Sequence, residues 1–391
     1  GVRPASNVRA AQPVFQAPEL VWETDGRTAA PQIVVDAAGR AHLFFMDIAE
    51  EGSTVTLYHV DLDRGAPFMP NDVLIGLAAD YRDYRLAADP FGNIHVLYMR
   101  QSVLWHMLAS GSEASDAGAW TEPVALGSAG PGAELAIDQR GRVHVCFPRG
   151  SDVRYMRSED GGATWTQDQL VAGLSFPSIP TYLACAVDTQ GVIHAAWAEA
   201  APPSFYPSLG TWYARSEDDG DTWGLPEQVA GEHFTLPELL ADGAGNVHML
   251  WQGDVGSGGR FFRERVAGTD GEWSASETVV PTGLGGMSGD APLAVDGDGN
   301  VHVVTSAPEP LWIGRGASGW GSPVGLATAL ADEPLETGSI EHPAFAIQDG
   351  NVAHVAFEFD FKRIYHVTGL LDAAEARSVP QGAPAALSAR L

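Results

Sequence analysis

Side chains that could bind a ligand or exchange protons with it form two groups along this chain. The first group is rich in arginine and tyrosine and contains Tyr81, Arg82, Tyr84, Arg85, Arg100 and Arg149. A guanidinium donates two parallel hydrogen bonds to a carboxylate, so these residues could hold an acidic ligand. The second group is mainly acidic and contains Glu199, Tyr206, His233, Glu238, Asp290, Glu341, His342, Glu358 and Asp360. Carboxylates in a partly desolvated site can separate their pKa values and act as acid and base.

An ordinary explanation stands beside this chemical one, because any of these residues could be a solvated charge in a surface salt bridge. Metal binding is a further possibility, since seven histidines recur: His42, His95, His144, His194, His248, His302 and His354. Their successive spacings are 53, 49, 50, 54, 54 and 52 residues. Metal ligands must converge within about 2 Å of one ion, which regularly spaced repeats do not achieve. We therefore expect structural hydrogen bonds from the histidines, and no metal or cofactor.

Each histidine is the last residue of one repeated sequence motif. An apolar strand leads into D-x-x-G-x-x-H, and a second apolar strand follows, as in AVDGDGNVHVVT; the last copy is altered to AIQDGNVAHVAF. The aspartate can cap its own backbone and the glycine tolerates a positive φ, so the motif predicts a tight hairpin. A third strand with an aromatic residue and a short fourth strand come next. A period near 50 residues is typical of a four-stranded blade.

The repeat predicts an all-β fold, a seven-bladed β-propeller of four-stranded antiparallel blades. We expect residues 1–391 to form a single domain, with an N-terminal extension (1–18), the blades (19–371) and a C-terminal tail (372–391). The segment ELVWE (19–23) precedes the first repeat as each fourth strand precedes the next. It is therefore predicted to close the ring as the outer strand of the last blade.

Two segments carry a family resemblance. SEDGGATW (158–165) and SEDDGDTW (216–223) fit the pattern S-x-D-x-G-x-T-W, and the chain thereby resembles the Asp-box, or BNR-repeat, sialidase-like propellers. The resemblance implies a structural hairpin, not an active site, built from Ser158, Asp160, Gly162, Trp165, Ser216, Asp218, Gly220 and Trp223. Sialidases usually have six blades and an R-I-P motif, which is missing here. Their catalytic residues therefore cannot be transferred to this chain.

In propellers of this kind, the hairpin of the repeat and the Asp-box share one face, and ligands usually bind on the other. The resemblance places the two ligand-binding groups on that second face. It implies a secreted or cell-surface protein that recognises a glycan or acidic saccharide. Two alternatives stay open: a glycan-cleaving enzyme, either a sialidase-like hydrolase or a polysaccharide lyase, and a non-catalytic docking subunit with protein partners in an extracellular assembly. Whether the protein is an enzyme is left open.

The composition of the chain disfavours some classes of binding partner. Fifty acidic residues against 22 basic ones give a net charge of −28, which disfavours nucleic acid and anionic membrane surfaces. No apolar run is long enough to span a bilayer, and residues 1–18 hold no signal-peptide core, so we expect a mature extracellular chain. Only Cys146 and Cys185 are available, and they are expected to be buried thiols, with a bridge between blades as the alternative.

Overall fold

The computed structural model describes residues 13–50, 54–66, 68–75, 84–201, 209–231, 235–253, 259–266, 272–280, 291–306, 309–316, 319–327 and 340–371. Strands dominate these ranges, and the only helices in them are two single 3-10 turns, η1 (Leu62–Arg64) and η2 (Ala117–Ala119). No helix in the described ranges has the length and apolar character needed to cross a membrane.

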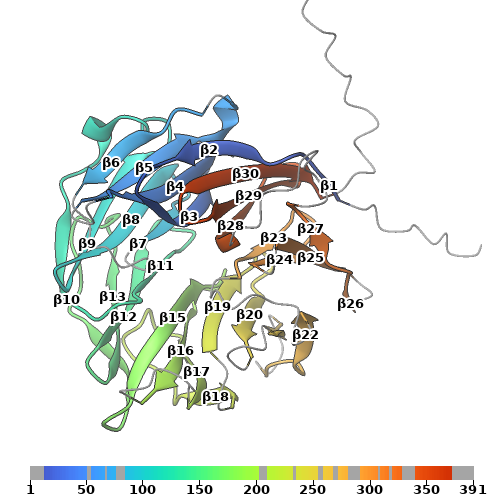
Figure 1. Ribbon diagram of the computed structural model, residues 1–391. Helices are drawn as coiled ribbons and strands as arrows, with labels where there is room; N and C mark the ends of the chain where they lie inside the picture. The colour runs from blue at the N-terminus through green and yellow to red at the C-terminus, as the bar shows by residue number, and fades with distance from the viewer. Residues whose placement is uncertain are drawn as a thin grey trace, which may run out of the picture.

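The strands form seven antiparallel sheets that follow one another as blades around a ring (Figure 1). Blade 1 contains β3 (Arg27–Val35), β4 (Ala41–Ile48), β5 (Val55–Asp61) and β6 (Asn71–Ile75). Blade 2 contains β7 (Tyr84–Ala88), β8 (Asn93–Arg100), β9 (Val103–Ser110) and β10 (Val124–Ser128). Blade 3 contains β11 (Glu134–Ile137), β12 (Val143–Arg149), β13 (Asp152–Ser158) and β14 (Gln169–Gly173).

The remaining blades repeat this order. Blade 4 contains β15 (Ile179–Val187), β16 (Ile193–Ala200), β17 (Gly210–Ser216) and β18 (Glu227–Ala230). Blade 5 contains β19 (Thr235–Ala241), β20 (Val247–Gln252), β21 (Arg260–Arg265) and β22 (Glu277–Val280). Blade 6 contains β23 (Leu293–Val295), β24 (Val301–Ser306), β25 (Pro310–Gly316), β26 (Gly319–Trp320) and β27 (Val324–Gly325). Blade 7 contains β28 (Ile340–Gln348), β29 (Val352–Phe359) and β30 (Arg363–Leu370).

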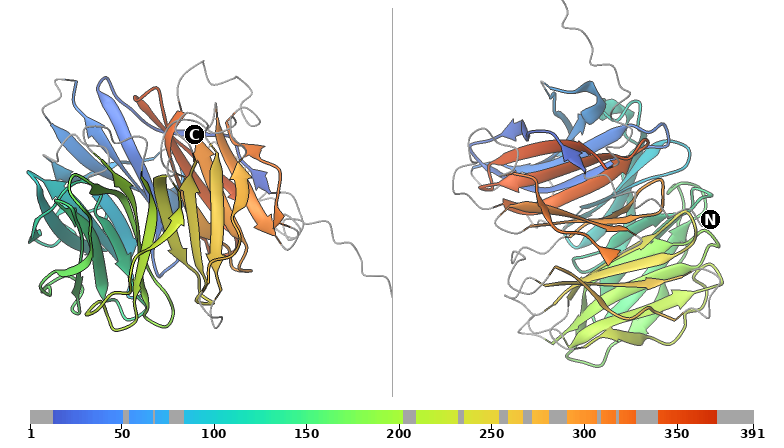
Figure 2. Two further views of the ribbon diagram at one scale, coloured as in Figure 1. Left: turned by 90° about the horizontal axis from the view of Figure 1, so that it is seen from below. Right: turned by 90° about the vertical axis from the view of Figure 1, so that its right-hand side faces the viewer.

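The N-terminal segment completes blade 7. Strand β2 (Glu19–Glu23) pairs antiparallel with β30, and Figure 1 shows the two strands running side by side. Strand β1 (Val14–Phe15), which lies within the predicted extension, pairs with the end of β30. The N-terminal and C-terminal strands of the chain thus share the sheet of blade 7, as the blue and red strands of Figure 2 show. Both the seven-bladed architecture and closure by ELVWE are confirmed, and closure covers the edge of β30 that would otherwise be exposed.

The hairpin between the first two strands of a blade is built as its sequence predicts. In blade 1, Asp36 Oδ1 accepts the backbone N–H groups of Ala38 and Arg40, at 2.9 Å each. Gly39 follows with a φ of 79°. The same two bonds recur at the aspartates of blades 2 to 6. We call the face that carries these hairpins the turn face, and the opposite face the loop face.

Apolar side chains fill the space between blades. Seven core clusters are found among the described residues, and each joins two neighbouring blades, the last blade to the first included. In the cluster between blades 3 and 4, Cys146 and Cys185 bring their Sγ atoms to 3.1 Å, and both are free thiols. Because the core lies between blades, no blade can bury its apolar faces alone, which ties stability to the closed ring.

Tryptophans near the turn face connect each of blades 2 to 6 to the blade before it. At five interfaces a tryptophan lies with its ring centroid 5.1–6.0 Å from an aromatic or histidine ring and nearly perpendicular to it. The pairs are Trp120 with Phe44, Trp165 with His106, Trp223 with Tyr155, Trp273 with Tyr213 and Trp320 with Phe262. Phe68 and His366 make a similar contact between blades 1 and 7. Edge-to-face pairs of this kind favour one relative placement of the blades.

Candidate functional site

The repeated histidines lie in buried polar rows near the turn face. In blade 1, His42 Nε2 lies 3.3 Å from Asp36 Oδ2, and His42 Nδ1 lies 2.9 Å from His59 Nε2 on the third strand. Blade 2 repeats this row with His106 as the third member. In blades 3 and 4 a tyrosine hydroxyl, of Tyr155 or Tyr213, replaces the second histidine. Each histidine thus has partners within its own blade.

Burial decides the charge of these rows. It lowers the pKa of His59, His106 and His366 to about 3, so these imidazoles are neutral at pH 7. Among the described residues no three histidine, cysteine or acidic side chains come close enough to hold a metal ion. In blades 1, 2, 4 and 7 the rows therefore satisfy buried polar groups between strands, which is a structural role.

The two Asp-box segments form hydrogen-bonded turns. Asp160 Oδ1 accepts the N–H of Thr164 and the hydroxyl of Ser158, at 2.8 Å each. Ser158 Oγ in turn accepts the N–H of Gly162 at 2.7 Å. Ser216, Asp218, Gly220 and Thr222 repeat these contacts in blade 4. A Cβ on Gly162 would lie 2.0 Å from His106 Cε1 of the preceding blade, so the turn sits directly on its neighbour.

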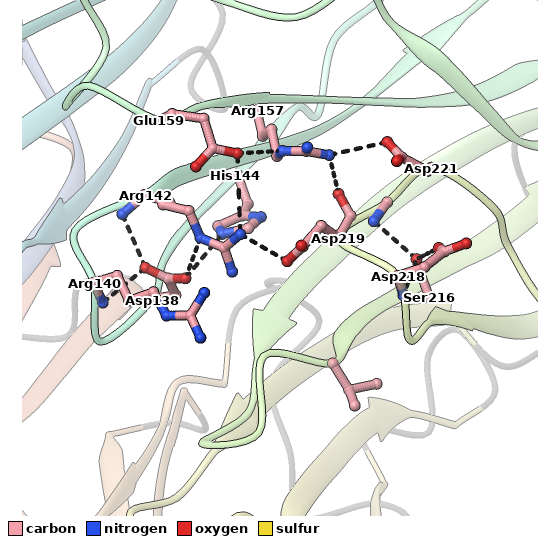
Figure 3. A network of polar contacts seen from close by, with 12 residues as sticks. Asp138, Arg140, Arg142, His144, Arg157, Glu159, Ser216, Asp218, Asp219 and Asp221 are labelled. Atoms are coloured by element: carbon pink, nitrogen blue, oxygen red, sulfur yellow. Dashed lines mark hydrogen bonds and ion pairs between the residues drawn. The ribbon is translucent and has the colours of Figure 1, made fainter.

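A larger polar cluster extends from the second of these turns across the interface of blades 3 and 4 (Figure 3). The Arg142 guanidinium donates to Asp138 at 2.7 Å and to Asp219 at 2.6 Å, and its side chain is 7% exposed. Arg157 donates to Glu159, to Asp221 and to the carbonyl of Asp219. Arg142 and Arg157 both already have acidic partners. The cluster holds two blades together and offers no open cation to a ligand.

On the loop face, the predicted basic group is divided among separate ion pairs. Arg85 Nε donates to Glu134 at 2.6 Å, which joins the inner strands of blades 2 and 3. Arg149 donates to Asp168 at 3.0 Å and to the carbonyl of Ser128. The structure therefore brings Arg85 and Arg149 to different carboxylates and shows no contact between them.

The other predicted residues occupy varied surroundings. Tyr84 is 1% exposed, and its hydroxyl donates to the carbonyls of Ala30 and Phe44, so it belongs to the core between blades 1 and 2. Arg100 is exposed at the end of β8. Glu199 and Glu238 lie on β16 and β19, in strands of blades 4 and 5. Tyr81, Arg82 and Tyr206 lie outside the described residues, as do His233 and Asp290.

A compact group of charged and aromatic residues lies where blades 7 and 1 meet on the loop face. We call it the mouth cluster, and it contains Arg27, Glu341, His342, Glu358 and Phe361. Glu341 and Glu358 are direct partners across the β28–β29 pair. His342 Nδ1 lies 3.3 Å from Glu358 Oε2. Arg27 is exposed on β3, and its guanidinium carbon lies 4.8 Å from the ring centroid of Phe361.

Electrostatics in the mouth cluster favours proton exchange. Burial raises the pKa of the Glu358 carboxyl, whose side chain is 0% exposed, while the bond to His342 and the charge of Arg27 oppose this rise. Glu341 adds to the rise through like charge. Glu358 Oε1 is buried without a hydrogen-bond partner among the described residues. The Glu358 carboxylate at Nδ1 orients the His342 imidazole, and an oriented imidazole can exchange a proton with a ligand.

The backbone of the mouth cluster is strained. His342 has a φ of 44°, and Phe361 has a φ of 56° in the turn between β29 and β30. Bulky residues rarely adopt left-handed backbone, which costs on the order of 1–2 kcal/mol. The bulge at His342 recurs at Ala30, Tyr182 and Leu236 in the inner strands of blades 1, 4 and 5, so the repeated fold enforces this backbone.

Sequence reasoning found part of this cluster. It identified Glu341, His342 and Glu358 as loop-face residues but did not find Arg27 or Phe361. A signal was present, because Arg27 opens the first inner strand and Phe361 lies in the last blade. Ring closure makes these blades neighbours. The cluster therefore combines a cation, an aromatic ring and a histidine–carboxylate pair, which suits a ligand with an acidic group and a sugar face.

Comparisons with known proteins support the fold. No family model matches the chain, and no curated protein matches its sequence. A PL25 ulvan lyase bound to -[GlcA(1-4)Rha3S]- is similar, with a TM-score of 0.58 and 12% identity, over 88% of this chain and 94% of that chain. Polysaccharide lyase Uly1 has a TM-score of 0.54 and 12% identity, over 85% and 88%. A protein of unknown function from Dyadobacter fermentans has a TM-score of 0.54 and 14% identity, over 93% and 100%. At such identities the likeness shows that this chain shares their β-propeller fold.

Proposed function

We propose that this protein recognises an acidic glycan at the mouth cluster on its loop face. The observation that carries this proposal is the exposed Arg27 guanidinium placed over the ring of Phe361, beside the buried His342–Glu358 pair. A guanidinium donates two parallel hydrogen bonds to a carboxylate or sulfate, and an aromatic ring provides an apolar surface for a sugar. Two of the similar structures are described as polysaccharide lyases, and one of them is bound to a glucuronate-containing saccharide, which agrees with this ligand class.

The ligand class also bears on where the protein acts. Acidic polysaccharides are found mainly outside cells or on their surfaces, so we propose that the protein acts there. Labelling of the protein on intact producing cells by a membrane-impermeant reagent tests this, and labelling only after lysis would contradict it.

Binding is tested with a glycan array followed by calorimetry on any saccharide that binds. Substituting Arg27→Ala removes the charge-assisted contacts, and we expect affinity to fall about tenfold to a hundredfold. Arg140→Ala is a matched control, because Arg140 is an exposed arginine on the turn face. An array without binding above background, or equal affinity in the Arg27 variant, would refute the proposal. Recovery of the protein only within a stoichiometric complex would favour a docking subunit instead.

A second candidate function, glycan cleavage, is favoured by the pairing of His342 with Glu358. In an elimination, His342 would take the proton from the carbon that bears the uronate carboxylate while the glycosidic C–O bond breaks. A carbon–carbon double bond then forms in the sugar, and the leaving oxygen takes up a proton. Incubation with uronate polysaccharides would produce an ultraviolet absorbance from that double bond. His342→Asn should abolish it, and undiminished absorbance in this variant would exclude His342 as the base.

A further inference from the structure

A groove between blades 4 and 5 lies outside the mouth cluster. It has a cavity volume of about 340 Å³ and runs between the outer strand β18 and strands β20 and β21. The lining residues used below are Gln228, Trp251, Phe261, Arg263 and Ser276. The volume falls within the range of roughly 300–1,000 Å³ typical of small-ligand sites.

Arg263 differs from the other arginines near this interface. It makes no ion pair among the described residues. Its Nε is buried without a hydrogen-bond partner there, as are the Nε atoms of Arg260 and Arg265. Two residues further along β21, Arg265 pairs with Glu227 at 3.3 Å. In a protein with a net charge of −28, a half-buried arginine without a carboxylate partner is unusual. Arg263 is therefore placed to receive an anion from outside the chain.

The aromatic wall of the groove carries a second unsatisfied donor. Trp251 is 2% exposed, and its indole N–H is buried without a hydrogen-bond partner. Its ring stacks with that of Phe261 at 6.2 Å between centroids, and the Arg263 guanidinium carbon lies 5.8 Å from the Trp251 ring. A buried donor without a partner costs roughly 1–3 kcal/mol. Among the described residues the same feature is found at Trp105, Trp197, Trp212, Trp223, Trp312 and Trp320, so it belongs to the packing of the blades.

Polar side chains complete the groove. Gln228 and Ser276 are exposed along its rim and can bond sugar hydroxyl groups. Cation, aromatic wall and rim amide together match a sugar ring that carries an anionic substituent. The groove opens beside the outer strand of blade 4, whereas the mouth cluster lies between blades 7 and 1.

We propose that this groove is a second saccharide site, which binds a single sugar unit bearing a carboxylate or sulfate group. Arg263 binds the anion, and Phe261, which is partly exposed, faces the ring. The site shares its ligand class with the mouth cluster but uses none of its residues. Two such sites on one propeller would hold a long acidic polysaccharide at two points, which raises its apparent affinity without new contacts.

The test follows the indole N–H resonance of Trp251 by NMR, assigned from its loss in the Trp251→Phe variant. We expect glucuronate or glucose 6-sulfate to shift this resonance, while uncharged glucose leaves it unchanged. A response to one of the two anionic sugars identifies the anion as carboxylate or sulfate. Arg263→Gln should weaken binding at least tenfold, whereas Arg215→Ala, which changes an ion-paired arginine of blade 4, should have no effect.

Several outcomes would overturn the second site: no shift with either anionic sugar, an equal shift with glucose, or an equal shift with inorganic sulfate. Unchanged binding in Arg263→Gln would do so as well. Arg27→Ala separates the two proposals, because it removes the cation of the mouth cluster and leaves Arg263 in place. A retained Trp251 shift in that variant supports an independent groove, and loss of the shift would contradict it.

Discussion

Arginine has opposite surroundings in the polar cluster of blades 3 and 4 and in the groove of blades 4 and 5. Arg142 is 7% exposed and has carboxylate partners at 2.7 Å and 2.6 Å. Arg263 is half-buried over Trp251 and has no ion pair among the described residues. A buried charge with full partners organises the fold, whereas one without partners is available to a ligand. The surroundings of an arginine, not its presence, therefore separate scaffold from candidate site.

The backbone shows a parallel difference between the two faces. Ten residues other than glycine have a positive φ among those described. All but Asp219 and Asn351 lie in bulges of the inner strands of blades 1, 4, 5 and 7 or in the turns between the second and third strands of blades 2 and 7. On the turn face, glycines such as Gly39 and Gly141 occupy such positions without steric cost. The repeat thus supplies a turn face with few strained positions, whereas those on the other side recur in blades 1, 2, 4, 5 and 7, and the mouth cluster contains two of them.

Acid should produce the largest effect, through the histidine rows of the turn face. The folded pKa values of His59, His106 and His366 are about 3, below the unfolded value of 6.5. The native state therefore binds fewer protons, so stability is complete above pH 6.5 and is lost as the pH falls. Between pH 6.5 and about pH 4, each residue should remove roughly 3 kcal/mol from the free energy of unfolding. Urea unfolding across this range measures the loss.

Blades 3 and 4 provide the control for the acid effect, because a tyrosine stands where His106 stands in blade 2. His106→Tyr should therefore fold and should lower the pH dependence by about 1.4 kcal/mol per pH unit, the share of one proton. A stability that does not change between pH 4 and pH 7, or the same slope in this variant, would show that the rows do not control acid unfolding.

Removing Arg142 should have the next largest effect. Arg142→Ala leaves Asp138 and Asp219 without their cation, and we expect a loss of about 3–5 kcal/mol in the free energy of unfolding. Arg140→Ala changes an exposed arginine two residues away and should cost less than about 0.5 kcal/mol. Equal midpoints of chemical denaturation for the two variants would show that the carboxylate partners of Arg142 do not stabilise the fold more than an exposed arginine does.

Contact between the Asp-box turn and the preceding blade can be tested at Gly220. A Cβ there would lie 2.0 Å from Tyr155 Cε1, and the φ of this residue is 87°. Gly220→Ala should cost roughly 1–3 kcal/mol, because the turn must move away from blade 3. Gly243→Ala is the control, since its added Cβ meets no atom within 4 Å and its φ is not positive. Thermal unfolding of both variants shows whether the clash or the loss of glycine itself matters.

The sequence predicts the scaffold well because the repeat uses the same chemistry in each blade. The aspartates, glycines and histidines of the hairpins recur, and their contacts follow from their positions within one blade. ELVWE could be placed because it occupies a fourth-strand position. The pairing of Arg85 with Glu134 was also open to prediction, since each lies four residues before the aspartate of its repeat, Asp89 or Asp138.

The candidate sites resist prediction because their residues come from different positions of the repeat. Arg27 and Phe361 are more than 300 residues apart, and their contact depends on ring closure and on an irregular turn. The groove depends on where β18 ends relative to Trp251. Burial of Tyr84 was equally hidden, because a tyrosine beside arginines has the same composition in a core as in a binding loop.

The smallest effect on stability should come from the loop face, at Phe361. Phe361 and Ser102 occupy equivalent positions in tight turns of blades 7 and 2, with φ values of 56° and 58°. Replacing either with glycine relieves left-handed strain but adds freedom to the unfolded chain. We therefore expect both Phe361→Gly and Ser102→Gly to change the free energy of unfolding by less than about 1 kcal/mol.

Binding should separate these two variants where stability does not. Phe361→Gly removes the ring under Arg27, so acidic glycan affinity should fall by about tenfold, whereas Ser102→Gly should bind as the unmodified protein does. Calorimetry with the same saccharide measures both. If the two variants bind equally, the strain at Phe361 is only a property of the turn, and the contrast between the faces has no functional meaning at this position. If only Phe361→Gly loses affinity, the strained turn is maintained for its side chain.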